Sequence, residues 1–182
     1  MAQNKTVKTH IRTAQINQTK QDFMTALTQL MADKPLVKIS VAAVVTRAGY
    51  ARRTFYRHFT TLDDVLRQRI DELTLLLYGQ LSQQHTILFE ETVQTFFSFW
   101  EPYQDFLKLL AQNNRLYLLE ESWRKNLAAS QLNELTMAYA DYFQQFALGG
   151  MFAMLSHWIQ QGAKESPQAM VTIATAIRRH LN

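Results

Sequence analysis

Residues that break helices are rare in this chain, and this scarcity constrains its fold more than any other feature. The 182 residues include only 3 prolines and 5 glycines, the two residue types that most disfavour helix interiors. No segment of useful length alternates apolar and polar residues as a strand does, whereas apolar residues at helical spacing recur along most of the chain. The sequence therefore predicts an all-α protein.

The three prolines fall where the helical patterns end. Apolar residues at helical spacing predict an amphipathic helix over 17–33, and Pro35 ends it. Pro102 separates two predicted helices that are rich in aromatic residues. Ser166 and Pro167 suit the N-cap and the first position of the last helix, which extends to residue 181.

Composition excludes several classes of protein. Hydrophobic residues make up 47% of the chain, which argues against disorder and is enough for a packed core. Cysteine is absent, which excludes a disulfide framework, a thiol nucleophile and thiolate metal sites. The longest apolar run, FALGGMFAML at 146–155, is far shorter than the roughly 20 residues of a spanning helix. We expect a soluble, cytoplasmic protein that spans no membrane.

Charge is distributed unevenly along the chain. Residues 1–70 contain 12 Lys and Arg against 4 Asp and Glu, a net charge of +8. Residues 71–182 contain 7 against 11, a net charge of −4, so the whole chain carries +4. A basic N-terminal part indicates a polyanionic partner, although charge alone leaves chance unevenness as an equal alternative.

Two short helices are predicted within the basic part. Ser40 suits the N-cap of a helix over 41–48, and Gly49 suits its C-terminal stop because glycine tolerates the left-handed conformation. A second short helix follows from Ala51 or Arg52. Thr61 with Asp64 then resembles a capping box at the start of a long helix. Two short helices joined by a tight turn fit helix-turn-helix geometry.

Helical phasing gives the second short helix two different faces. Phe55 and Phe59 are four residues apart and face inward together. The exposed arc then contains Arg52, Arg53, Tyr56 and Arg57. Arginine is suited to guanine or phosphate, and a tyrosine hydroxyl can contact a phosphate. Phasing and charge alone also allow a solvated basic helix on the surface of a bundle.

The segment ISVAAVVTRAGYARRTFYRHFTTLDDVL, residues 39–66, resembles the helix-turn-helix signature of the TetR family of bacterial transcriptional regulators. The resemblance covers about the first 70 residues. It implies a three-helix DNA-binding domain followed by a helical-bundle domain that binds a small-molecule effector and dimerises. Such proteins usually act as homodimers on palindromic operators and release DNA when the effector binds.

The resemblance also assigns roles to individual residues. Ser40 sits where the family caps the second helix and touches phosphate, and Tyr56 and His58 sit at phosphate-contacting positions. Two departures from the family pattern are Ala51, where an N-cap such as serine is usual, and threonine at 60 and 61, where many members carry lysine. The predicted DNA-contacting residues are Ser40, Tyr50, Arg52, Arg53, Thr54, Tyr56, Arg57, His58 and Thr61.

The C-terminal half is predicted to contain a dimer interface. The stretch at 148–170 is similar to a C-terminal type found in Gram-positive members of the family. Its apolar stripe includes small residues that would allow helices to approach closely; taken alone, the stripe is equally compatible with the core of a monomer. The predicted interface residues are Phe146, Gly150, Met151, Met154, Trp158, Ile173 and Ile177.

Aromatic residues cluster in the middle of the chain. Such a cluster can line a pocket for an apolar effector, although rings at helical spacing more often form core. The predicted pocket residues are Phe96, Trp100, Tyr103, Phe106, Tyr117 and Trp123. Histidines in this half show no metal-binding spacing, so no metal and no cofactor are expected.

The predicted organisation is an N-terminal arm at 1–15, a helix-turn-helix domain at 16–60, and a helical effector-binding and dimerisation domain at 61–182. The predicted function is that of a DNA-binding transcriptional regulator, a repressor whose partners are double-stranded operator DNA, a second copy of the chain and a small molecule. Alternatives are a co-activator or accessory regulator of the same fold, and a helical adaptor for proteins. The sequence contains no recognisable pairing of a nucleophile with a base and no glycine-rich loop for phosphate, so it does not indicate an enzyme.

Overall fold

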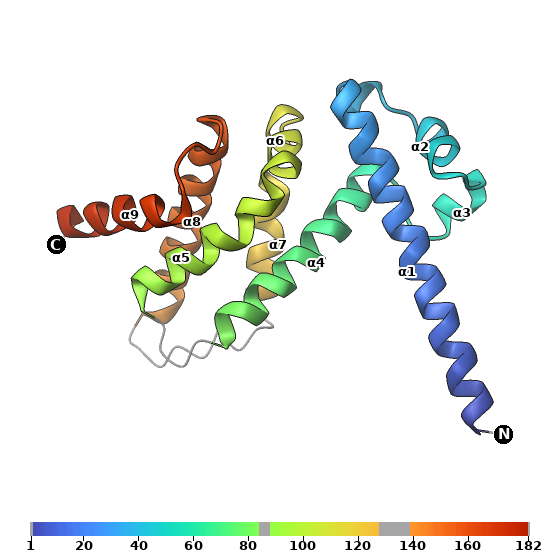
Figure 1. Ribbon diagram of the computed structural model, residues 1–182, viewed down its shortest axis with the longest axis horizontal. Coiled ribbons are helices and arrows are strands. Elements are labelled where there is room, and N and C mark those ends of the chain that lie inside the picture. The colour runs from blue at the N-terminus through green and yellow to red at the C-terminus, as the bar shows by residue number, and fades with distance from the viewer. Residues whose placement is uncertain (1, 84–87, 128–138, 182) are drawn as a thin grey trace. The chain divides into compact units, whose positions relative to one another are not determined.

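The computed structural model describes the backbone of residues 2–83, 88–127 and 139–181, and the side chains within these ranges from residue 12 to residue 180. All regular elements within these ranges are helices (Figure 1), as the all-α prediction requires. The chain divides into two compact units, Met1–Arg69 and Ile70–Asn182.

The first unit begins with a helix that is longer than predicted. Helix α1 extends over Ala2–Asp33, whereas the sequence predicts a start near residue 17 and an N-terminal arm at 1–15. The arm is therefore helical from Ala2 onward. The physical reason is that neither glycine nor proline occurs before Pro35, so no residue stops the helix from extending toward the N-terminus.

The predicted short helices follow with the predicted caps. A 3-10 turn, η1 (Leu36–Lys38), leads to α2 (Val41–Ala48), where the Ser40 hydroxyl accepts a hydrogen bond from the Ala43 N–H at 3.2 Å. Gly49 ends α2 at φ 76°, in the left-handed region. Helix α3 (Arg52–Tyr56) comes next, and α4 (Leu62–Ser82) begins in the first unit and continues in the second.

The capping box at the start of α4 is confirmed. The Asp64 carboxylate accepts hydrogen bonds from the backbone N–H groups of Thr60 at 2.9 Å and Thr61 at 2.7 Å. In return, the Thr61 hydroxyl accepts one from the Asp64 N–H at 3.2 Å. Burial raises the pKa of the Asp64 carboxyl, but the backbone hydrogen bonds from Thr61 and Thr60 outweigh it and leave that pKa below its ordinary value.

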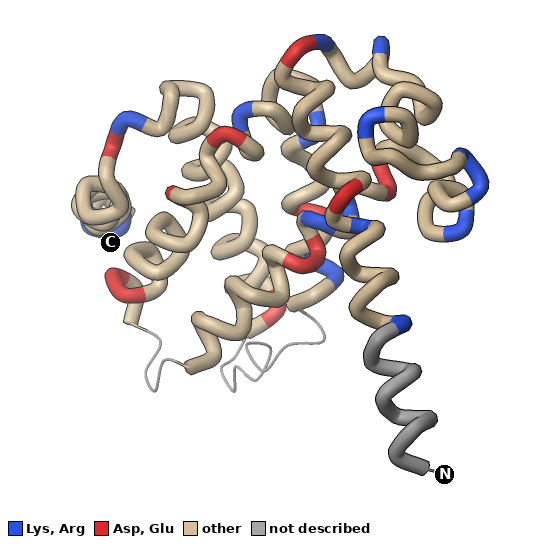
Figure 2. The backbone as a smooth tube through the Cα atoms, turned by 45° about the vertical axis from the view of Figure 1, so that its right-hand side comes forward, with Lys and Arg blue, Asp and Glu red and all other residues tan. Residues whose placement is uncertain are grey.

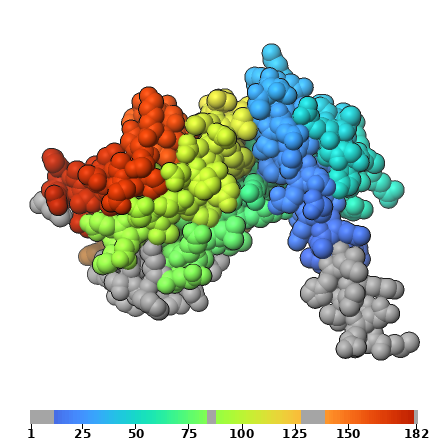
Figure 3. Space-filling view, viewed as in Figure 1, coloured from blue at the N-terminus to red at the C-terminus, as the bar shows by residue number. Residues whose placement is uncertain are grey.

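The described part of the second unit contains the rest of α4 and the helices α5, α6, α7, α8 and α9. Helix α5 packs against α9, while α8 packs against α6 and α7; Figure 3 shows the side chains of α9 lying directly on those of α5. Pro102 lies in the 3-10 turn η2 between α5 and α6, and Pro167 is the first residue of α9, as predicted. The bounds are α5 (Phe89–Trp100), η2 (Glu101–Tyr103), α6 (Gln104–Gln112), α7 (Tyr117–Leu127), α8 (Ala140–Gln160) and α9 (Pro167–Leu181).

Polar contacts join α4 to α7 inside the second unit. The Asp71 carboxylate accepts hydrogen bonds from the Ser122 hydroxyl at 2.6 Å and from the Lys125 ammonium at 2.8 Å. About two turns further along α4, the Tyr78 hydroxyl donates a hydrogen bond to the Trp123 carbonyl at 2.9 Å. Burial raises the pKa of Tyr78 well above its ordinary value, so the hydroxyl stays protonated and remains a donor.

Candidate nucleic-acid interface

Helix α3 is anchored by the two phenylalanines predicted to face inward. Phe55 is fully buried and Phe59 is 5% exposed, which confirms the phasing. Both rings pack on Phe23 of α1, with centroid distances of 5.4 Å and 6.2 Å and edge-to-face orientations. Edge-to-face aromatic pairs contribute beyond the area they bury. This packing holds the five residues of α3, too few to be stable alone.

The start of α3 lacks a side-chain cap, as the sequence predicts. Ala51 occupies the N-cap position with extended backbone, and no side chain caps the first turn. The Thr54 N–H donates to the Ala51 carbonyl at 2.8 Å. The other N–H groups in the first turn of a helix have no partner within the helix and ordinarily need an acceptor from a side chain, from water or from a ligand.

The outward arc of α3 carries the predicted cations. Arg52, Arg53, Tyr56 and Arg57 are exposed, and Thr54 is half-buried. The Arg52 guanidinium lies 5.5 Å from the centre of the Tyr56 ring and donates a hydrogen bond to the Tyr56 hydroxyl at 3.3 Å. This contact orders both side chains one turn apart on the same face.

These cations form no ion pair with any carboxylate that the structure describes. Among the described residues, none of the ion pairs involves Arg52, Arg53 or Arg57. The nearby acids are used elsewhere, since Asp22 accepts from Tyr50 and Asp64 caps α4. Figure 2 shows the Lys and Arg positions of the short helices gathered at the edge of the first unit. This edge can attract a polyanion because its charge is uncompensated.

The structure places the remaining predicted contacts in two groups. Ser40 and Thr61 are exposed at the starts of α2 and α4, where their hydroxyls already serve as caps. Tyr50 is half-buried, and its hydroxyl donates to the Asp22 carboxylate at 2.6 Å while its ring packs on Phe23. Tyr50 therefore ties the turn between α2 and α3 to α1, a structural role that the sequence prediction of a DNA contact does not include.

His58 lies in the turn directly after α3. Its Nε2 atom is enclosed and has no hydrogen-bond partner among the described residues. Burial lowers the pKa of His58 below its ordinary value, and the charges of Arg57 and Lys20 lower it further. The ring is therefore mainly neutral near pH 7 in the absence of an anion.

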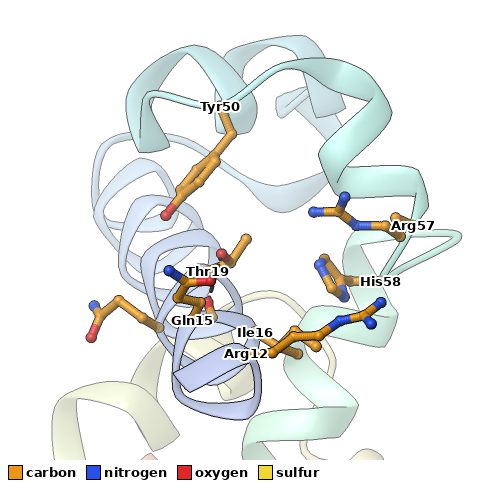
Figure 4. Close-up of a pocket in the computed structure, with 8 residues that line it drawn as sticks. Arg12, Gln15, Ile16, Thr19, Tyr50, Arg57 and His58 are labelled. Carbon is orange, nitrogen blue, oxygen red and sulfur yellow. Dashed lines mark hydrogen bonds between the residues drawn. The ribbon is translucent and has the colours of Figure 1, made fainter. Parts of the chain in front are cut away.

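A hollow of about 630 Å³ opens beside His58 in the first unit. It is lined by α1 on one side and by Tyr50, Arg57 and His58 on the other (Figure 4). Arg12 of α1 also lines it, and sequence reasoning missed this residue. The only signal was its charge within the basic N-terminal part, because the predicted helix began five residues later.

A second cavity, of about 470 Å³, lies within the second unit. Residues of α4, α5, α7, α8 and α9 line it, almost all of them apolar. Two residues of the predicted effector pocket, Phe96 and Trp123, are among them. Five residues of the predicted dimer interface also line it, namely Phe146, Gly150, Met151, Met154 and Ile177.

The other predicted pocket aromatics lie outside this cavity. Trp100 is fully buried and packs on Phe99 and Trp123, with centroid distances of 5.1 Å and 6.1 Å, so it belongs to the core. Tyr103 and Phe106 are half-buried away from the cavity, and Tyr117 is 42% exposed. Rings at helical spacing fill the core here because adjacent helices bury them, the alternative left open by the sequence.

Trp158 is buried within the second unit. Its side chain is 2% exposed, its ring packs on Phe97 at 5.5 Å, and its indole N–H donates to the Glu165 carbonyl at 2.9 Å. The residue predicted at the dimer interface is thus packed inside a single copy, where the loop before α9 binds its indole N–H. Ile173 and Ile177 of α9, by contrast, are exposed.

The described residues provide neither a metal site nor a membrane span. No group of three or more His, Asp or Glu side chains is arranged to hold a metal ion. None of the described helices has both the length and the apolar character needed to cross a membrane.

The N-terminal unit matches a known family of regulators. Residues 23–68 match the family described as bacterial regulatory proteins, tetR family. Over 96 residues the chain is 30% identical to a Haemophilus influenzae protein described as an uncharacterized HTH-type transcriptional regulator. The match covers 49% of this chain and 47% of that protein, so the chain spans about half the length of this curated relative.

Solved structures of low sequence identity share the fold over most of the chain. One is a TetR transcriptional regulator from Streptococcus agalactiae, with a TM-score of 0.64, 23% identity, and coverage of 93% of this chain and 98% of that one. Another is the fatty acid degradation regulator FadR from Bacillus halodurans, with a TM-score of 0.62, 17% identity, and coverage of 85% and 91%. The segment at 23–68 therefore matches the tetR family of bacterial regulatory proteins, and the chain shares the fold of these solved structures over most of its length.

Proposed function

We propose that the chain is a sequence-specific DNA-binding transcriptional regulator, a homodimeric repressor that leaves a palindromic operator when a small molecule binds its helical unit. The observation that carries the DNA-binding part is the outer arc of α3. There Arg52, Arg53 and Arg57 are exposed and have no carboxylate partner among the described residues, while the buried Phe55 ring anchors the helix.

The chemistry of this arc suits the major groove of DNA. The first residues of a recognition helix reach base edges, and Arg52 and Arg53 are the first two residues of α3. An arginine fork can bind guanine O6 and N7 with two parallel hydrogen bonds. Because Tyr56 holds the Arg52 guanidinium in place, we assign Arg53 to a base edge and Arg52 with Tyr56 to the adjoining edge or backbone.

The test begins with selection of bound duplexes from a random pool by the full-length chain. Arg53→Ala should then weaken binding to the selected sequence by about 1–3 kcal/mol and relax the preference at one base position. The matched control is Arg124→Ala in α7, which removes the same charge from a residue paired with Glu120 in the second unit. Absence of any enriched sequence, or equal losses for the two variants, would reject the assignment.

Dimerisation is supported by an exposed apolar surface on α8 and α9. Tyr142 and Phe146 are 73% and 70% exposed on α8, and Ile173 and Ile177 are exposed on α9. A two-fold axis would bring the same patch of both copies together. Tyr142 does not line the cavity, so Tyr142→Glu should yield monomers in sedimentation without altering ligand binding; a persistent dimer would move the interface elsewhere.

Effector binding is supported by the apolar cavity of the second unit. Its volume of about 470 Å³ and its nearly apolar lining suit a small apolar molecule. One protein of similar fold is titled a fatty acid degradation regulator, so fatty acids of several chain lengths belong in the first ligand set. Met154→Trp should fill the cavity and abolish ligand-induced release of DNA; undiminished release would place the effector elsewhere.

A further inference from the structure

The hollow beside the recognition helix is built from two elements that are distant in sequence. Arg12, Gln15, Ile16 and Thr19 line it from α1, and Tyr50, Arg57 and His58 line it from the helix-turn-helix. Figure 4 shows the Arg57 guanidinium directed across the opening toward α1, with His58 below it and the Arg12 side chain reaching from α1 toward His58.

Two arginines line this hollow without forming an ion pair to any described carboxylate. Neither Arg12 nor Arg57 takes part in an ion pair among the described residues. The carboxylate of Asp22 on α1 is already bound by the Tyr50 hydroxyl at 2.6 Å and by the Gln18 amide at 2.8 Å. Like charges that face one hollow repel each other, and an anion bound between them relieves that repulsion.

We propose that Arg12, Arg57 and His58 form a phosphate site through which α1 grips the DNA backbone beside the recognition helix. The inference rests on the proposed DNA-binding function and adds to it a second contacting element. Arginine forks suit phosphate oxygens, and backbone phosphates set the register of a protein on DNA. The hollow directly adjoins the outward arc of α3, because Arg57 occupies the C-cap position of α3 and His58 follows it.

Arg12 lies outside the part of the chain that matches the family. The match begins at residue 23, and Arg12 precedes it by 11 residues, roughly 16 Å along an α-helix. The contact therefore depends on the N-terminal extension of α1, which begins at Ala2. Phosphate contact is independent of sequence, so the site raises affinity for all DNA while α3 sets the preference.

The test compares Arg12→Gln with Lys34→Gln in the full-length chain. Lys34 follows the other end of α1, roughly 33 Å from Arg12 by helical rise, and its replacement removes the same charge. Binding to a duplex of arbitrary sequence is measured at several salt concentrations. Arg12→Gln should reduce the slope of log K against log salt by about 0.9 and weaken binding roughly tenfold, with the sequence preference intact.

Three outcomes would overturn the inference. Equal losses for Arg12→Gln and Lys34→Gln would show a general effect of charge, and an unchanged slope for Arg12→Gln would show no contact. Inorganic phosphate tests the other source of the same chemistry. If phosphate shifts the ring resonances of His58 in the wild-type chain but Arg12→Gln leaves DNA binding unchanged, the site serves a free anion and not the DNA backbone.

Failure of this inference is separable from failure of the proposed function. A wild-type chain that binds no duplex at any salt concentration would remove both. Wild-type binding with a normal salt response, together with an unaffected Arg12→Gln variant, would remove only the role of α1. Thermal melting followed by circular dichroism checks that both variants fold, as expected for a residue as exposed as Arg12.

Discussion

The ring of Phe23 in α1 meets the ring of Phe55 in α3 edge to face, with centroids 5.4 Å apart and planes inclined at 79°. Both side chains are fully buried. Since α3 has only five residues, this pair determines whether the helix exists at all and therefore whether its arginines share one face.

Phe55→Ala should destabilise the first unit by about 3–5 kcal/mol, because it removes a fully buried ring and leaves a cavity between α1 and α3. Urea unfolding followed by circular dichroism measures the loss, and gel shifts should show that DNA binding disappears with it. Tyr56→Phe is the control for stability alone, since it removes an exposed hydroxyl that accepts a hydrogen bond from Arg52. A Phe55→Ala variant of unchanged stability would contradict the anchoring role.

Ala51→Ser should stabilise the first unit by about 1 kcal/mol. Ala51 has the extended backbone of an N-cap but offers no side-chain acceptor, and a serine hydroxyl can accept from the first turn of α3. Differential scanning calorimetry should show a higher melting temperature for Ala51→Ser than for Ala51→Val, which adds bulk without an acceptor. If the two variants melt alike, the uncapped turn is not a weak point.

His58 should make stability fall as the pH is lowered through about 6.5, the ordinary pKa of histidine. Burial, Arg57 and Lys20 lower its pKa in the folded chain. The unfolded chain therefore binds a proton at a higher pH than the folded chain does. The free energy of unfolding then rises with pH through this window and reaches its full value above it.

The measurement is urea unfolding at pH 5.5, 6.5 and 7.5, compared with His58→Gln. The groups around the ring are cationic on both sides, Arg57 and Lys20 among them together with Arg12 across the hollow. His58→Gln should flatten the dependence over this range. A slope that survives the substitution would assign the effect to another titrating group.

Gly150→Leu should weaken the proposed dimer while the chain remains folded. A Cβ atom added at Gly150 meets no atom within 4 Å, so there is room for the first side-chain atom inside one copy, and replacing glycine in a helix favours the helix. Sedimentation equilibrium should show a higher dissociation constant. Gly79→Leu is the matched control, because a Cβ at Gly79 of α4 also meets no atom; equal behaviour of the two variants would argue against an interface at α8.

Local sequence determined most of the secondary structure and the outward arc of α3. The capping pair of Thr61 with Asp64, the left-handed stop at Gly49 and the uncapped start at Ala51 are all found as predicted. So is the inward phase of Phe55 and Phe59. These features depend on residues within about four positions of one another, and such short-range patterns can be recognised in sequence.

Only the tertiary structure decided which face of each helix meets which neighbour. The apolar stripe of α8 looked like one interface in sequence, yet Trp158 lies in the core, Met151 and Met154 line a cavity, and Tyr142 is exposed. Arg12 and His58 line one hollow although 46 positions separate them in the sequence. Helical periodicity identifies an apolar face but not the residues that cover it, because those contacts come from helices distant in the chain.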